Sequence, residues 1–138
     1  MAYVYDKLAE KYPFMQRQRQ PDPRFISNLY WAFGIECGPG WYELIDELCG
    51  YIQKHLESTP GLRFEPAQIK EKFGGLRFYY DYGDDYIRQL VNGAEEKSFK
   101  VCEGCGKSGR LMKSKTGWLR TLCSMCQKLS SEGFEAIQ

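Results

Sequence analysis

Long apolar runs are missing from this sequence of 138 residues, and no segment approaches the ~18 apolar residues that a bilayer-spanning helix needs. Residues 1–12 mix charged and apolar side chains, so we expect neither a secretory signal nor a membrane partner. His55 is the only histidine, whereas most metal-nuclease patterns need two or more. The motifs GxxxxGK[ST], HExxH and GxSxG are also absent. These absences favour a protein that is not an enzyme.

The composition is that of an ordinary globular protein, with 43% apolar and 27% charged residues. Aromatic residues are frequent at 15%, so a few large side chains can fill the core. The length allows one domain, or one core with a small metal-nucleated lobe. We expect residues 1–99 to form the core and residues 100–138 to form a lobe that packs on it.

Four of the six cysteines form the array C-x2-C-x17-C-x2-C. Two matched CxxC pairs at this spacing are typical of a four-thiolate zinc site, which is closed and structural. In the absence of a signal, paired cysteines favour a reducing compartment and a metal over disulfides. Cys37 and Cys49 have no further ligands nearby, and we interpret them as small buried apolar side chains. The predicted ligands of a structural Zn²⁺ are Cys102, Cys105, Cys123 and Cys126.

The segment between the two pairs predicts a β-hairpin, with arms at 110–112 and 118–122 around the turn 113–117. A helix can follow in residues 127–137. The order knuckle, hairpin and helix resembles a treble-clef finger, and a zinc ribbon is the close alternative. We expect Trp118 and Leu122 to form the apolar patch under the metal. Because zinc binding contributes ~10–16 kcal/mol, we expect this lobe to unfold without metal.

The remaining pattern predicts an α+β core. Apolar residues from Trp41 to Leu56 follow one helical stripe, which predicts a helix over 40–57. Residues 76–82 alternate as an aromatic strand, and Gly74-Gly75 is a hairpin signal. Its partner arm, 64–73, fits either a strand or a short helix, and we favour the strand because it gives the aromatic strand a partner. Residues 25–35 fit either a helix or a strand. Short helices are predicted over 4–12 and from Asp84 or Asp85 to about Lys100.

Charge is distributed unevenly along the chain. Residues 97–128 carry eight cations against Glu103 alone, a net charge of +7, whereas residues 31–62 carry a net charge of −4. A basic lobe with an aromatic side chain suits phosphate contact and base stacking. A solvated surface, a pairing with the acidic helix at 43–47, or an acidic protein partner would also explain it. The candidate binding residues are Lys107, Arg110, Lys113, Lys115, Trp118 and Arg120, with Arg17, Arg19 and Arg24 second.

Three motifs together resemble a known family: FGIECGPGWYELIDELC, QIKEKFGGLRFYYDYGDDYI and CEGCGKSGRL…GWLRTLC. They are similar to those of small zinc-binding hypothetical proteins encoded by bacteriophages and prophages, and the resemblance covers about residues 12–126. It implies phage origin, the cytoplasm of a host cell and zinc, without an activity or catalytic residues. Some members place a histidine in the last ligand pair, where this chain has cysteine. The loop QRQRQPDPR lies outside the shared pattern.

Two functions are consistent with such a protein. The first is an accessory role in which the basic zinc lobe binds nucleic acid or a host nucleoprotein. The second is direct inhibition of a host defence nuclease, as anti-CRISPR proteins do. A third hypothesis is a metal-dependent hydrolase that uses Glu36 and the carboxylates of Asp84 and Asp85. The sequence fixes neither the partner nor the oligomeric state.

Overall fold

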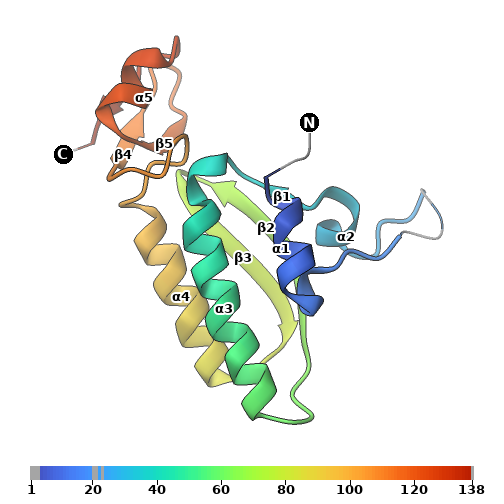
Figure 1. Cartoon of the computed structure of the whole chain (residues 1–138). Helices are drawn as coiled ribbons and strands as arrows, with labels where there is room; N and C mark the ends of the chain where they lie inside the picture. The colour runs from blue at the N-terminus through green and yellow to red at the C-terminus, as the bar shows by residue number, and fades with distance from the viewer. Residues whose placement is uncertain (1–3, 20–21, 23, 138) are drawn as a thin grey trace.

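A computed structural model describes residues 4–19, 22 and 24–137. Two long helices, α3 (Tyr42–Ser58) and α4 (Asp85–Ser98), lie side by side on one face of a three-stranded sheet, and Figure 1 shows this layer. A second three-stranded sheet belongs to the last third of the chain. The protein is therefore mixed α and β, as predicted. None of the described helices combines the length and the apolar character that crossing a bilayer requires.

Helix α3 forms where the apolar stripe predicts it. A short 3-10 turn over Pro39–Trp41 starts it, and Pro39 suits a first helical position because that position needs no N–H donor. The stripe from Leu44 to Ile52 is buried against the sheet and α4, while Glu43 and Glu47 are exposed. Trp41 is fully buried at the start of the helix.

The first sheet has the order β1-β2-β3, with β1 (Ile35–Glu36) parallel to β2 (Phe64–Lys72) and β3 (Gly75–Tyr82) antiparallel to β2. Residues 64–72 are thus a strand rather than a helix, and Phe73 belongs to the turn that follows. Ile69 pairs with Ile35 on one side and Phe78 on the other, and all three are buried. An irregularity between Pro66 and Gln68 lets β2 accommodate a proline.

The N-terminal elements cover the edge of this sheet. They are α1 (Asp6–Lys11), the 3-10 turn Pro13–Met15 and α2 (Leu29–Phe33). The ambiguous segment 25–35 therefore contains a one-turn helix followed directly by the start of β1. Asn28 explains the turn: its side chain accepts a hydrogen bond from the Trp31 N–H as an N-cap and donates one to the Pro66 carbonyl at 2.9 Å.

Helix α4 connects the core to the cysteine array. Asp84 caps it by accepting a hydrogen bond from the Ile87 N–H at 3.0 Å. At its other end the buried Ser98 hydroxyl accepts a hydrogen bond from the Leu76 N–H at 2.9 Å, which ties the helix to β3. The chain then reaches Cys102 without a flexible linker.

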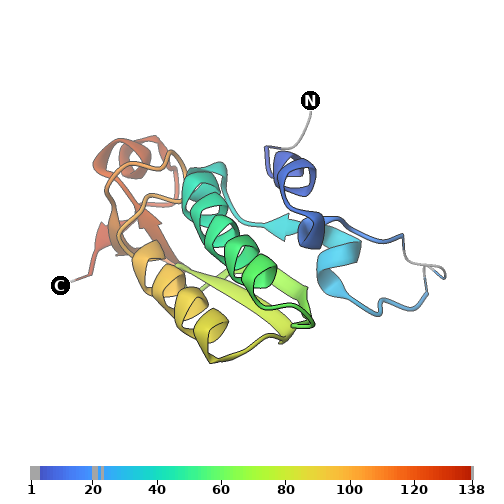
Figure 2. The same ribbon diagram turned by 60° about the horizontal axis from the view of Figure 1, so that its bottom comes forward.

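The last third of the chain, residues 100–137, is called the metal lobe below. Strands β4 (Arg110–Lys113) and β5 (Leu119–Leu122) form the predicted hairpin. The predicted terminal helix is shorter than expected: α5 covers Ser124–Leu129 only, and β6 (Glu135–Ala136) then pairs antiparallel with β4. Gly133, at a φ of +69°, allows this reversal, and Phe134 is buried inside the lobe. Figure 2 shows the lobe at one end of the molecule and α2 at the other.

Candidate metal centre

The first cysteine pair lies in a tight loop at the end of α4. The Gly106 N–H donates to the Cys102 carbonyl at 2.9 Å, and the Cys102 N–H donates to the Lys107 carbonyl at 2.7 Å. Gly106 has a φ of +87°, where a side chain would be strained. A Cβ on Gly104 would lie 3.1 Å from the Cys126 sulfur. The two glycines of the motif therefore let the loop curl around the position of a metal.

The second pair lies at the start of α5. Cys123 is the N-cap residue, and its sulfur accepts a hydrogen bond from the Cys126 N–H at 3.4 Å. This hydrogen bond lowers the pKa of the Cys123 thiol to about 6, whereas burial raises the pKa of Cys126 to about 12. Without a metal, four neighbouring thiols do not all ionise, because the negative charges of the thiolates repel one another. A bound dication favours the thiolate form of all four.

The four sulfur atoms meet the distance test for one metal ion. All of them lie within 4.8 Å of one another, and Cys105 Sγ lies 3.5 Å from Cys123 Sγ. A tetrahedral site with metal–sulfur bonds of about 2.3 Å has sulfur–sulfur edges of about 3.8 Å. Within the described ranges, no other group of three or more His, Cys, Asp or Glu side chains is arranged in this way. The predicted ligand residues are thus brought together.

A small apolar cluster closes the centre from one side. Met112, Leu122 and Phe134 are buried and pack with Cys102 and Cys123. Leu122 therefore lies where the sequence predicts. Trp118 does not: its side chain is 69% exposed, so its predicted place under the metal is wrong. Phe134, carried back by the turn before β6, fills that role, and no local pattern in the sequence indicates it.

Glu103, between the first two cysteines, fastens the metal lobe to the core. Its side chain is buried, and its Oε2 atom accepts a hydrogen bond from the Gly38 N–H at 2.8 Å. Its carbonyl accepts another from the Gly40 N–H at 2.8 Å. Its Oε1 atom lies 3.4 Å from Nε of Arg120. Sequence reasoning missed this role, although Gly38 and Gly40 are a signal: a Cβ on either would collide with Glu103.

Two more hydrogen bonds reinforce the same junction. The buried Trp41 indole donates to the Val101 carbonyl at 2.8 Å, and the buried Thr121 hydroxyl donates to the Gly74 carbonyl at 2.7 Å. Gly74 is the tip of the β2–β3 hairpin and lies against Leu111. The lobe is therefore held by the ends of α3, α4 and the hairpin, not by α4 alone.

The predicted basic residues divide into groups. Lys107, Arg110, Lys113 and Lys115 are exposed, and within the described residues none of them forms an ion pair. Arg120 is instead engaged by Glu103. The strand register places Arg110 and Arg120 on one face of the β4–β5 hairpin and Lys113 on the other. The cations therefore surround the hairpin and do not line one face of it.

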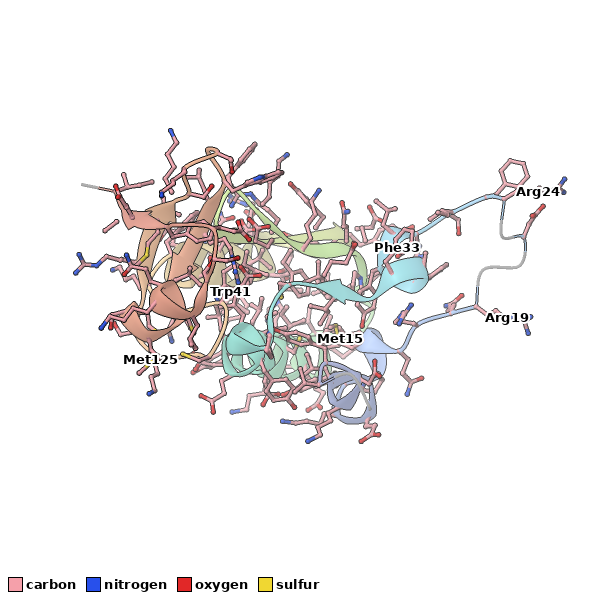
Figure 3. The ribbon with its side chains drawn as sticks, turned by 90° about the horizontal axis from the view of Figure 1, so that it is seen from above. Met15, Arg19, Arg24, Phe33, Trp41 and Met125 are labelled. Carbon is pink, nitrogen blue, oxygen red and sulfur yellow. The ribbon has the colours of Figure 1, made fainter. Side chains whose placement is uncertain are left out.

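The secondary candidates lie at the opposite end of the molecule, as Figure 3 shows for Arg19 and Arg24. Arg17 is fixed, because its guanidinium donates to the carbonyls of Trp31 and Ala32. Arg24 forms an ion pair with Asp22 at 3.0 Å. The structure does not bring these arginines to the metal lobe.

The residues of the hydrolase hypothesis do not converge. Glu36 is exposed. In the strand register it lies opposite Lys70 of β2, and Lys70 lies opposite Arg77 of β3. Asp84 follows the far end of β3, roughly 16 Å or more along the strand from that position. The Asp84 carboxylate is already engaged by the Ile87 N–H and by His55 Nε2 at 2.7 Å. The other thiols are poor nucleophiles, because burial raises the pKa of Cys37 to about 12 and that of Cys49 further.

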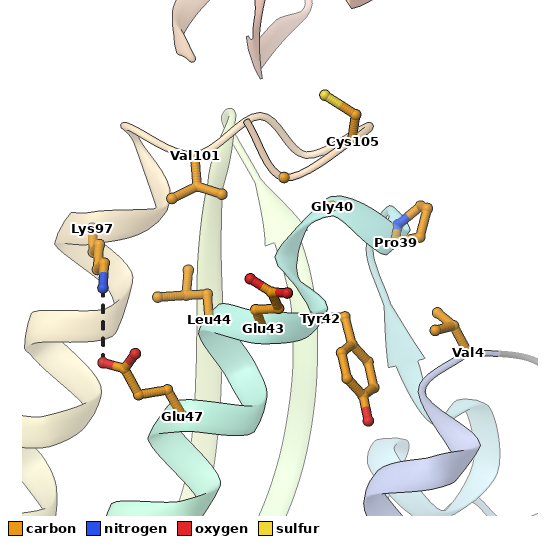
Figure 4. A pocket seen from close by; sticks show the side chains of 11 residues that line it. Val4, Pro39, Gly40, Tyr42, Glu43, Leu44, Glu47, Lys97, Val101 and Cys105 are labelled. Atoms are coloured by element: carbon orange, nitrogen blue, oxygen red, sulfur yellow. Dashed lines mark ion pairs between the residues drawn. The ribbon is translucent and has the colours of Figure 1, made fainter. Parts of the chain in front are cut away.

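A cavity of about 370 Å³ adjoins the first cysteine loop between the ends of α3 and α4, and Figure 4 shows its lining. Its lining includes the apolar Leu44 and Val101 and the exposed Glu43 and Glu47. Among the described lining residues Lys97 is the one cation, and it pairs with Glu47 at 3.7 Å. The negative balance makes this cavity unsuitable for an anionic ligand.

Comparisons with known proteins found no match: no family model, no curated protein and no solved structure matches the chain. The resemblance to phage-encoded proteins therefore stays a prediction.

Proposed function

We propose that the four thiolates hold one structural Zn²⁺. The all-sulfur donor set and the tetrahedral spacing support zinc, and four protein ligands leave no open position for a substrate. When bound, the ion supplies shape and not a reaction. Cys123 caps α5 and Cys126 lies in its first turn, so the order knuckle, hairpin and helix favours a treble-clef arrangement over a zinc ribbon.

We further propose that the protein is a non-enzymatic accessory factor that binds nucleic acid through the metal lobe. The observation that carries this proposal is Trp118, which is 69% exposed at the tip of the β4–β5 hairpin. The turn is rigid because buried Ser114 accepts a hydrogen bond from the Trp118 N–H at 2.9 Å and contacts the Thr116 hydroxyl. A large aromatic ring held out into solvent on a fixed turn suits base stacking.

The cations around this tip support contact with phosphates. Lys113 at the end of β4 and Lys115 in the turn belong to the same hairpin end as Trp118, and within the described residues neither forms an ion pair. Arg110 lines a cavity of about 350 Å³ together with Ser108, Ser124 and Gln127. One guanidinium, two hydroxyls and one amide are suitable donors for a phosphate group.

Binding to fluorescent oligonucleotides at several salt concentrations tests this function. Replacing Trp118 by alanine should weaken binding by about 1–3 kcal/mol. The double variant Lys113→Ala/Lys115→Ala should weaken binding to all sequences and flatten the log–log salt dependence by about 1 to 2. Lys54→Ala, an exposed cation on α3, is the matched control and should behave as the wild type. An absence of binding at low salt would overturn the proposal.

A second candidate, direct binding to a host protein such as a defence nuclease, is favoured by a separate observation. Phe25, Ile26, Leu29 and Phe33 are exposed near α2, at the end far from the metal lobe. An apolar group of this kind, with arginines beside it, suits an acidic protein surface. Capture of one host protein that survives nuclease treatment and is lost in Leu29→Ala/Phe33→Ala supports this candidate. We include in this proposal that the protein is of phage origin and acts in the cytoplasm of the host cell.

A further inference from the structure

The turn between β2 and β3 contains an unusual residue. Phe73 and Gly74 are its two central residues and have φ angles of +54° and +87°, as in a type I′ turn. Asn-Gly is the preferred pair there, and a bulky residue at positive φ is strained. Burial does not compensate, since Phe73 is 65% exposed. Local folding preferences and core packing therefore both argue against phenylalanine at this position.

Other residues hold the turn in place. The Glu71 carboxylate accepts a hydrogen bond from the Gly74 N–H at 2.8 Å, and the Thr121 hydroxyl bonds the Gly74 carbonyl. Lys72 Nζ lies 5.6 Å from the centre of the Phe73 ring. Strain that is retained by its surroundings at an exposed aromatic residue points to a function of that side chain.

The sheet beside this turn has an open face. Leu76, Phe78 and Tyr80 point toward the helices, so the alternate residues Arg77 and Tyr79 point away from them. Both long helices lie on the inner face (Figures 1 and 2). The outer face remains half-buried or exposed along Gln68, Lys70, Lys72, Arg77 and Tyr79.

Two like charges face each other across this open face. Lys70 and Arg77 are directly paired in the β2–β3 register, an arrangement that is destabilising without an anion. Within the described residues neither forms an ion pair. Glu36 of β1 is the register neighbour of Lys70, and Lys72 adds another cation two residues along the strand. Glu65 and Asp81 pair with each other farther from the turn on the same face. The excess of cations is therefore confined to the end of the face next to the Phe73 turn, and this end suits an anionic ligand.

The open face continues onto the metal lobe through the Phe73 turn. A Cβ on Gly74 would collide with the Leu111 side chain and would lie 3.4 Å from the backbone that joins Leu119 to Arg120. Leu119 directly follows Trp118 in the chain. The tip of the β2–β3 hairpin therefore packs against the two strands of the lobe hairpin that carries Trp118.

We propose that this outer face and the Phe73 turn are the second half of one binding track for single-stranded nucleic acid. Phe73 and Tyr79 stack on bases, and Lys70, Lys72 and Arg77 hold phosphates. The proposal rests on nucleic-acid binding by the metal lobe and adds its substrate class. Stacking on exposed rings requires bases that are not already paired, so a single strand fits and a duplex does not. DNA and RNA strands share this chemistry.

Phe73→Asn separates a binding role from a folding role. Asparagine suits a positive φ, so the variant should unfold at the same or a higher temperature than the wild type. Its affinity for a single strand should fall roughly 5- to 150-fold, as expected for the loss of one stacked base. Tyr51→Ala, which removes an exposed aromatic residue from α3 on the other side of the molecule, should leave the affinity unchanged.

Binding is measured with oligothymidylate, oligouridylate and a duplex, and Lys70→Ala/Arg77→Ala is tested in parallel. We expect both single strands to bind more tightly than the duplex and the double variant to reduce the salt dependence. If Trp118→Ala weakens binding while Phe73→Asn and Lys70→Ala/Arg77→Ala do not, the extended track is wrong and the function of the lobe stands. Preference for the duplex also overturns the track. If no nucleic acid binds to the wild type, both proposals fail together.

Discussion

The core and the metal lobe are stabilised by different means. Among the residues that the structure describes, seventeen buried apolar side chains form one cluster in the core, whereas five do so in the lobe. Two of those five are the candidate ligands Cys102 and Cys123. Segments below about 40 residues rarely fold on apolar burial alone and usually need a metal or disulfides. We therefore expect the core to fold through packing, and the lobe to depend on the proposed metal and on its junction with the core.

Removal of one metal ligand should give the largest difference in stability between the metal lobe and the core. Cys123→Ser should abolish metal binding and unfold residues 100–137, since structural zinc contributes about 10–16 kcal/mol. Metal content by mass spectrometry and amide exchange of the lobe measure the loss. Cys37→Ala removes a thiol that is not among the four and should keep one equivalent of metal. Full metal content in Cys123→Ser would contradict the assignment of this ligand.

A cavity in the core should give the complementary result. Ile52 is fully buried in α3, and Ile52→Ala should lower the free energy of unfolding by about 2–5 kcal/mol. At temperatures where the variant is still folded, the metal should stay bound. Chemical denaturation combined with metal analysis checks both points, and Lys54→Ala serves as the surface control. Metal loss before the core unfolds would show that the two regions are not independent.

Replacement of Glu103, at the junction of lobe and core, should lower stability less than Cys123→Ser or Ile52→Ala. Glu103→Ala leaves the half-buried Gly38 N–H without its acceptor and frees Arg120, which should lower stability by about 1–3 kcal/mol with the metal retained. Faster amide exchange at Gly38 and Gly40 would locate the effect. Glu132→Ala, an exposed acid in the same lobe, is the matched control. Equal stability of the two variants would remove Glu103 from the junction.

The smallest effect is expected at the far end of the core, where Asp84 bonds His55. The hydrogen bond with His55 has the largest effect on the pKa of Asp84, and the hydrogen bond from the Ile87 N–H acts in the same direction. Both hold this pKa below its ordinary value of 3.8. A lowered folded pKa stabilises the native state above the unfolded pKa, and this contribution is lost as the pH falls through the folded value. The stability difference between wild type and Asp84→Asn should thus be present at neutral pH and vanish in acid. A difference independent of pH would contradict this origin.

The sequence predicts best where one local pattern decides the structure. The stripe from Trp41 to Leu56 places α3, and the spacing of the four cysteines indicates their convergence. Residues 64–72 have no decisive period, and pairing with β1 and β3 makes them a strand. Glu103 and Phe134 act through partners far along the chain. Trp118 is apolar, so the sequence alone suggests burial, yet its turn points it into solvent.

We expect that a bound metal builds the lobe and keeps its hairpin rigid while the core folds independently. Amide exchange of the full-length protein, before and after metal removal by a strong chelator, tests it most directly. We predict that protection is lost throughout residues 100–137, including β4 and β5, and is kept in the centres of α3, β2 and β3. Unchanged protection of the lobe in metal-free protein would contradict the claim.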